Sequence, residues 1–185
     1  MRTAPALLIG ALVSLSLVAC VPDDAPIRPD PSPTAQPIFA SDEEALAAAE
    51  EAYAAYVELS DQILADGGAD PERISAYVSE SIRQEVLDGF ALYSDNSWHT
   101  SGQSTFDNVQ LQQHVSDGPD TASVVFYVCA DVSLVRILDA SGADVTPASR
   151  PDRVPLEVEI EFTSVENALV GKSDLWSGDD FCSGL

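Results

Sequence analysis

Three cysteines carry the most reactive side chains of this chain: Cys20, Cys129 and Cys182. A cysteine thiol can be acylated, form a disulfide, ligate a metal or act as a nucleophile. The last two roles have little support. The two histidines, His99 and His114, do not share zinc-ligand spacing with the cysteines, and no cysteine has an evident partner base. Because three is an odd number, at least one cysteine lies outside an intramolecular disulfide.

The residues before Cys20 have the pattern of an export signal. Arg2 is followed by an uncharged, mostly apolar run over residues 6–19, which is shorter than the roughly 20 residues that a membrane-spanning helix needs. The run ends in "LVAC", with Leu17 three positions before Cys20 and the small Ala19 directly before it. This ending resembles the lipobox of bacterial lipoproteins. An ordinary secretory signal with an unrelated cysteine is the alternative.

The resemblance implies that residues 1–19 are a lipoprotein signal peptide and that Cys20 becomes the acylated first residue after cleavage. Each acyl methylene buried in a bilayer contributes about 0.8 kcal/mol, and two chains anchor a protein far more stably than one. The implied location is the outer face of the cytoplasmic membrane, with the lipid bilayer as a partner through Cys20. Residues 20–40 are rich in proline, which predicts an extended, disordered tether ahead of a domain at residues 41–185.

An acylated Cys20 leaves Cys129 and Cys182 as a pair in an oxidising compartment, where a disulfide is the expected state. Cys129 lies in the strongest predicted strand, and Cys182 lies close to the C-terminus. The bridge would therefore pin the C-terminal tail onto the sheet. In the chain-entropy model it stabilises the fold by roughly 4 kcal/mol.

Helical signals dominate the first half of the predicted domain. "SDEE" is a capping box, in which Ser41 accepts from the Glu44 N–H and the Glu44 carboxylate accepts from the Ser41 N–H. Apolar residues then recur at helical spacing as far as Leu64, and a glycine pair ends the helix. Asp70 as an N-cap, followed by proline, predicts a second start and one or two helical pieces as far as Tyr93.

Strand signals dominate the second half. The predicted strands cover residues 109–115, 121–138, 154–165 and 167–176. The second run is too long for one flat strand and is expected to bend or bulge near residues 130–133, and "DASG" at residues 139–142 predicts a hairpin turn. Helices followed by antiparallel strands predict an α+β fold, with N-terminal helices packed on a curved antiparallel sheet. An unrelated helix-and-meander fold is the alternative.

The charged residues limit the partners that the domain can have. The formal net charge of −23 at pH 7 disfavours nucleic acid and other polyanions. Glu157, Glu159 and Glu161 share one face of a predicted strand and could bind a cation, although the solvent side of a half-buried sheet is the commoner interpretation. The sequence contains no phosphate-binding glycine loop, nucleophile elbow or metal-binding motif, so no cofactor, metal site or catalytic residue is predicted.

The order of elements resembles the NTF2-like (SnoaL-like, cystatin-like) α+β cone and is similar to lipoproteins secreted by high-GC Gram-positive bacteria. The resemblance rests on the first helix, "ALAAAEEAYAAYVELSDQIL", the strand "VVFYVCADVS" and the closing "LVGKSDLWSGDDFC". In NTF2-like folds the mouth of the cone lies between the helices and the sheet. The resemblance therefore implies a candidate pocket formed by Tyr53, Tyr56, Trp98, His99 and Asp131.

Two functions from different classes are compatible with this pattern. The first is a membrane-anchored extracytoplasmic lipoprotein whose domain binds a small apolar ligand or an envelope protein. The alternative is an NTF2-like enzyme of isomerase or dehydratase type acting on a small apolar molecule, with Asp131 as base and Tyr53 or Tyr56 as donors. A deep pocket with a buried carboxylate or histidine would favour the enzyme, whereas a cone filled by its own side chains would favour an interaction or structural module. A domain that only spaces or shields the cell surface is a third hypothesis.

Overall fold

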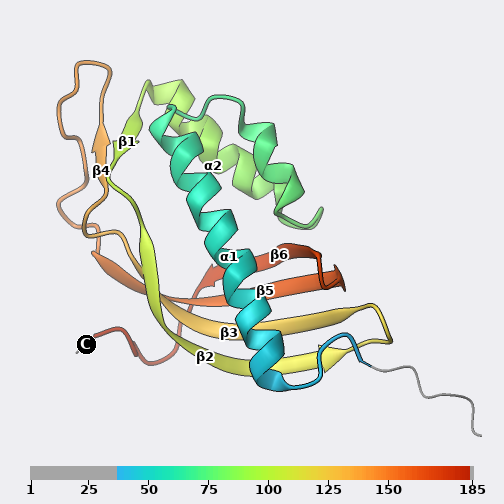
Figure 1. Cartoon of the computed structure of the whole chain (residues 1–185). Coiled ribbons are helices and arrows are strands. Elements are labelled where there is room, and N and C mark those ends of the chain that lie inside the picture. Colours follow the sequence, from blue (N-terminus) through green and yellow to red (C-terminus); the bar gives the residue numbers. More distant parts are fainter. Residues whose placement is uncertain (1–36, 184–185) are drawn as a thin grey trace, which may run out of the picture. The chain divides into compact units, whose positions relative to one another are not determined.

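The computed structural model describes residues 37–183, which form helical segments followed by antiparallel strands (Figure 1). The helical segments are α1 (Asp42–Ala65), the 3-10 helix η1 (Pro71–Ala76) and α2 (Arg83–Asn96). The strands are β1 (His99–Ser101), β2 (Thr105–Ser116), β3 (Ala122–Asp131), β4 (Arg136–Leu138), β5 (Arg153–Ser164) and β6 (Asn167–Leu175). This confirms the predicted α+β fold, with the helices preceding a curved antiparallel sheet.

The main sheet contains β2, β3, β5 and β6 in that order, and each strand pairs antiparallel with its neighbours. Alternate residues of β3 and β5 face the helices, because successive side chains of a strand point to opposite faces. Fully buried side chains on this inner face are Val124, Phe126, Val128, Val158 and Ile160. β1 and β4 pair with each other in a separate two-stranded sheet.

α1 crosses the inner face of the main sheet (Figure 1). Ala45, Ala49 and Tyr53 recur at helical spacing and are buried in the core that α1 shares with the strands. The two alanines let the first turns of α1 lie close to the sheet, whereas Tyr53 fills the wider space further along. In the part of the chain from residue 37 to 183, no helix has the combination of length and apolar character needed to span a membrane.

The N-terminus of α1 is capped by both partners of the predicted capping box. Ser41 Oγ accepts a hydrogen bond from the Glu44 N–H at 3.2 Å. The Glu44 carboxylate accepts from the Ala40 N–H at 2.8 Å, one residue before the predicted donor. Phe39, in the stretch that the sequence assigns to the tether, is 2% exposed and packs edge-on against Phe162 at 4.8 Å. The packed part of the chain therefore includes residues ahead of Ser41.

Two backbone features place α2 beside α1 and β6. Gly68 follows α1 with φ of 77°, and its N–H donates to the Ile63 carbonyl at 2.8 Å, which turns the chain back sharply. The segment after η1 then runs along the edge of β6. There the Ser79 N–H donates to the Val170 carbonyl at 2.9 Å, and the Val170 N–H donates to the Tyr77 carbonyl at 2.8 Å. These two hydrogen bonds hold the start of α2 close to β6.

Two local predictions hold only in part. Asp70 is the N-cap residue of η1, as predicted, but the turn after the glycine pair gives it a left-handed φ of 48°, and its side chain makes no capping hydrogen bond. The helical segment that follows is a 3-10 helix. The long run over residues 121–138 breaks completely instead of bending: β3 ends at Asp131, a turn closes with the Val135 N–H donating to the Val132 carbonyl at 3.0 Å, and β4 joins the other sheet.

Candidate functional site

A groove of about 360 Å³ lies between α1, α2 and β6. This volume is at the small end of the range for small-molecule sites. The apolar part of its lining consists of Leu64, Ile82, Val86 and Phe90 with the rings of Tyr56 and Tyr93. The polar part consists of Ser60, Glu85, Ser173 and Asp174. An apolar wall with a few polar groups is the usual composition of a ligand-binding site.

α2 supplies one wall of this groove. Ile82, Val86 and Phe90 recur every four residues and Tyr93 follows three later, so these side chains share one face of the helix. Gly89 lies on the same wall, where an added Cβ atom would meet no atom within 4 Å. The missing side chain at Gly89 therefore helps to keep the groove open.

Tyr56 of α1 lines the groove, and Tyr53 of the same helix lies next to it in the core. The rings of Tyr53 and Tyr56 stack with centroids 5.9 Å apart, and the Tyr53 hydroxyl lies 3.5 Å from Ser173 Oγ on β6. Burial raises the pKa of Tyr53 to about 12. Burial also raises the pKa of Tyr56, and the nearby Glu85 carboxylate acts in the same direction. Both side chains are therefore neutral phenols at ordinary pH.

The five candidate pocket residues do not all meet at this groove. Tyr53 and Tyr56 contact each other, but only Tyr56 lines the groove itself. Trp98 does not line the groove, but its ring packs edge-on against Tyr93 of the lining at a centroid distance of 6.1 Å. His99 opens β1 and is absent from the groove lining.

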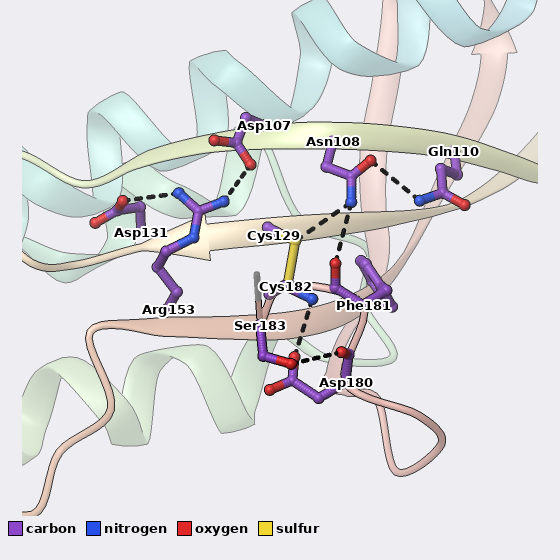
Figure 2. The surroundings of a disulfide bond; sticks show 10 residues. All are labelled: Asp107, Asn108, Gln110, Cys129, Asp131, Arg153, Asp180, Phe181, Cys182 and Ser183. Atoms are coloured by element: carbon purple, nitrogen blue, oxygen red, sulfur yellow. Dashed lines mark hydrogen bonds and ion pairs between the residues drawn. A yellow bond between two sulfur atoms is a disulfide. The ribbon is translucent and has the colours of Figure 1, made fainter. Parts of the chain in front are cut away.

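Asp131 lies apart from the tyrosines, at the end of β3 close to the disulfide (Figure 2). Its carboxylate accepts from Arg153 at 2.9 Å, and Arg153 also donates to Asp107 at 2.6 Å. Hydrogen bonds from Ser133, together with the Arg153 guanidinium, hold the pKa of Asp131 below its usual range. Asp131 is therefore a carboxylate held in an ion-pair cluster.

The sequence predicts only part of the groove lining. The helical spacing of Ile82, Val86 and Phe90 predicts that they face inward, and they do line the groove. Ser173 and Asp174 come from a strand more than seventy residues later, so only the tertiary structure brings them to α2. No local pattern could have paired them with this helix face.

A disulfide joins Cys129 on β3 to Cys182, with an S–S distance of 2.07 Å and a Cα–Cα distance of 5.6 Å (Figure 2). Both cysteine side chains are buried. This is the pair that the sequence predicts, and it holds the C-terminal tail against the outer face of the sheet. The predicted acylation site, Cys20, lies outside the described residues.

Aromatic side chains continue this contact between the tail and the sheet. Tyr127 on β3 packs against Trp176 at a centroid distance of 4.5 Å and stacks on Phe181 at 5.7 Å. Asn108, at a bulge of β2 with φ of 53°, donates to the Phe181 carbonyl at 3.4 Å (Figure 2). The tail thus covers part of the face opposite the helices.

The three glutamates of β5 lie on this outer face, and two of them have protein partners. Glu157 forms an ion pair with Lys172, and Glu159 accepts from Ser123 at 2.6 Å. Among residues 37–183 the structure contains no group of three or more histidine, cysteine, aspartate or glutamate side chains placed to hold a metal ion. The geometry therefore favours the interpretation of this face as a polar sheet surface.

Comparisons with known proteins support the fold. A scan against models of protein families found no match, and a search of curated proteins found none either. Among solved structures, the intermembrane space region of the chloroplast protein ARC6 is similar with a TM-score of 0.52 and 12% sequence identity, over 72% of this chain and 97% of that chain. Aln2 from a Streptomyces species was also found, with a TM-score of 0.33 and 14% identity over 71% of this chain and 92% of that chain. At this identity, the likeness to the ARC6 region concerns the fold alone.

Proposed function

We propose that this chain is a lipoprotein anchored through Cys20 to the outer face of the cytoplasmic membrane, whose NTF2-like α+β domain binds a small apolar ligand in the groove between α1, α2 and β6. The observation that carries the binding role is the apolar wall formed by Leu64, Ile82, Val86 and Phe90. Burial of a ligand against such a wall is favourable by about 25 cal/mol for each Å² of apolar surface removed from water.

Binding is better supported than catalysis by the arrangement of titratable groups. In the part of the chain that the structure describes, the buried polar side chains besides Tyr53 are those of Ser79 and Thr100, and neither is a general base. Asp131, the base of the enzyme hypothesis, is paired with Arg153 away from the groove. A small ligand would therefore meet hydroxyls and exposed carboxylates, without a buried acid or base.

The anchor is tested by Cys20→Ser in the producing bacterium. Loss of the thiol prevents acylation, so we expect the protein to appear in the medium or to remain unprocessed. Fractionation of cells and medium, with mass spectrometry of the N-terminus, measures this. Cys182→Ser is the matched control, because it replaces a cysteine of the disulfide and should leave the lipid anchor in place. Normal membrane retention of Cys20→Ser would contradict the lipoprotein assignment.

The groove is tested by filling it. We expect 4-phenylbutan-1-ol, a neutral apolar probe, to bind the full-length chain in isothermal titration calorimetry, and Gly89→Leu to weaken this binding at least tenfold. Leucine at position 89 enters open space on a helix and improves helix propensity, so the fold is retained. Asp95→Leu adds the same side chain to α2 outside the groove lining and should leave the affinity unchanged. Equal affinities for the unaltered chain and the two variants would show that the probe binds outside the groove.

A further inference from the structure

β2 forms one edge of the main sheet (Figure 1) and pairs with β3 on one side only. In an antiparallel strand, alternate residues direct their backbone N–H and C=O groups to opposite sides. Part of the backbone of β2 therefore points away from β3. From residue 37 to residue 183, no segment pairs with this side of the strand through backbone hydrogen bonds. Such an edge is a template on which another strand can pair.

The two edges of the sheet differ in how far they are covered. At the β6 edge, Val78 forms a bridge with Val170, and hydrogen bonds on either side of it hold the segment before α2 in place. The β2 edge has no such cover within the described residues. A groove of about 290 Å³ separates α1 from the start of β2, and its apolar lining consists of Ala54, Val57 and Phe106. The helix therefore leaves the β2 edge accessible.

The open edge lacks the charges that usually protect such strands. Natural edge strands carry lysine, other charged side chains or proline, which prevent pairing with another chain. Residues 108–116 of β2 contain neither proline nor any aspartate, glutamate, lysine or arginine, in a chain of formal net charge −23. Asp107, directly before this stretch, is paired with Arg153 at 2.6 Å. A basic partner would find no carboxylate along the stretch, whereas a second acidic copy meets less repulsion here than at a charged surface.

The irregular shape of β2 also favours an identical partner. Its pairing with β3 shifts register between Asp107 and Gln110 and again between Leu111 and Gln113. Bulges of this kind increase the local twist, so a flat strand would fit the edge poorly. A second copy of β2 carries the same twist, and twofold symmetry makes the surface complementary to itself.

We propose that two copies of this chain associate through the β2 edge. The two β2 strands pair antiparallel about a twofold axis within residues 108–116, which joins the two main sheets into one. Because β2 and β6 lie at opposite edges of the sheet, this dimer leaves the groove between α1, α2 and β6 open. The inference therefore goes beyond the proposed function and does not depend on it.

Sedimentation equilibrium of the full-length chain, in a detergent matched to the solvent density, measures the association. At neutral pH and at protein concentrations of about 10–300 µM, we expect a monomer–dimer equilibrium. Raising salt from about 50 to about 500 mM should strengthen the association, because salt screens the repulsion between two acidic chains. An interface held by opposite charges would weaken instead.

The variant Gln110→Glu/Gln113→Glu tests whether the β2 edge is the interface. Both glutamines are exposed, so the variant should fold. In the dimer it places like charges beside each other across the twofold axis, and we expect association to weaken by about tenfold or more. The matched control is Gln84→Glu/Ala91→Glu, which adds the same two charges at exposed positions of α2 and should keep the affinity within about twofold. The membrane anchor is the same in all three proteins, so association through the anchor would persist in the edge variant.

Hydrogen exchange of residues 108–116 identifies the contact surface directly. Pairing protects the β2 amides that point away from β3, so in the unaltered chain this segment should exchange more slowly at about 300 µM than at about 10 µM. Three outcomes would overturn the inference: a monomer throughout this range, equal association of the edge variant and the unaltered chain, or exchange of residues 108–116 that is independent of concentration. None of these outcomes bears on ligand binding in the groove, which the neutral probe tests separately.

Discussion

At the scale of single residues, Tyr53 connects the core to Ser173, a residue of the groove lining. Its ring packs against Phe106 and Phe126 at centroid distances of 5.1 and 5.9 Å, and its hydroxyl lies 3.5 Å from Ser173 Oγ. The side chain is 3% exposed, and burial raises its pKa from 10.0 to about 12. Folding therefore keeps this phenol neutral over a pH range in which the unfolded chain would ionise it.

This shift makes the stability of the fold sensitive to alkaline pH. Between about pH 10 and 12 the folded state binds more protons than the unfolded state, so the free energy of unfolding falls as pH rises. The contribution of Tyr53 lost by pH 11 is about 1.4 kcal/mol, and the full loss is on the order of 2–3 kcal/mol. We expect Tyr53→Phe to reduce the difference in unfolding free energy between pH 8 and pH 11 by about 1.4 kcal/mol. Urea denaturation at the two pH values measures it.

Tyr77→Phe is the matched control for this measurement. Tyr77 is 36% exposed and lies outside the core, so its replacement should leave the alkaline loss as it is in the unaltered protein. Phenylalanine at position 53 gives up one long hydrogen bond and retains the ring contacts, so the variant should fold at pH 8. An unchanged alkaline loss in Tyr53→Phe would show that this phenol ionises in the folded state as easily as in the unfolded one.

At the scale of elements, the groove depends on how closely α2 approaches the end of α1. Gly68 has φ of 77°, and a Cβ atom placed there would collide with the backbone carbonyl of Phe90 on α2. Phe90 is itself part of the groove wall. The same glycine thus supplies a left-handed turn after α1 and the close approach of the two helices.

Gly68→Ala should separate these two effects when it is compared with Gly142→Ala. Gly142 also has a positive φ, of 82°, but an added Cβ atom there meets nothing within 4 Å. We expect Gly142→Ala to cost about 1–2 kcal/mol of unfolding free energy from backbone strain alone. Gly68→Ala should cost clearly more, because α2 must also move away, and it should weaken binding of 4-phenylbutan-1-ol. Equal costs for the two variants in urea denaturation would mean that the contact with Phe90 relaxes freely.

Local sequence patterns predict the helices and strands better than the tertiary contacts between them. The Ser41 capping box and the alternation in β3 and β5 depend on neighbouring residues, and both are present in the structure. The groove requires Val170 to hydrogen-bond with the Tyr77–Ser79 segment, which brings Ser173 and Asp174 to α2. This contact joins residues far apart in the chain, and no periodicity within either segment encodes it.

At the scale of the whole molecule, the disulfide connects the end of the chain to the centre of the sheet. Cys129 and Cys182 are 53 positions apart, and the intervening residues include β4, β5 and β6. The tail packs Phe181 on Tyr127, on the face of β3 opposite the buried Phe126. The helices and the groove lie on the inner face. The disulfide therefore holds the tail on the outer face of the sheet, whereas the candidate binding site lies on the inner face.

Removal of the bridge should affect these two faces differently. Cys129→Ala/Cys182→Ala should lower the free energy of unfolding by about 2–4 kcal/mol, since a loop of this length is no longer closed in the unfolded state. Hydrogen exchange of the amides of residues 177–183 should become fast, because few contacts remain to hold the tail. The affinity for 4-phenylbutan-1-ol should stay within about twofold at temperatures where the variant is folded, because the groove lining includes no residue of the tail. Cys20→Ser, which removes a cysteine outside the pair, should leave both stability and tail protection unchanged. Slow exchange of the tail amides in the double variant would instead mean that the aromatic contacts with Tyr127 hold the tail without the covalent bond.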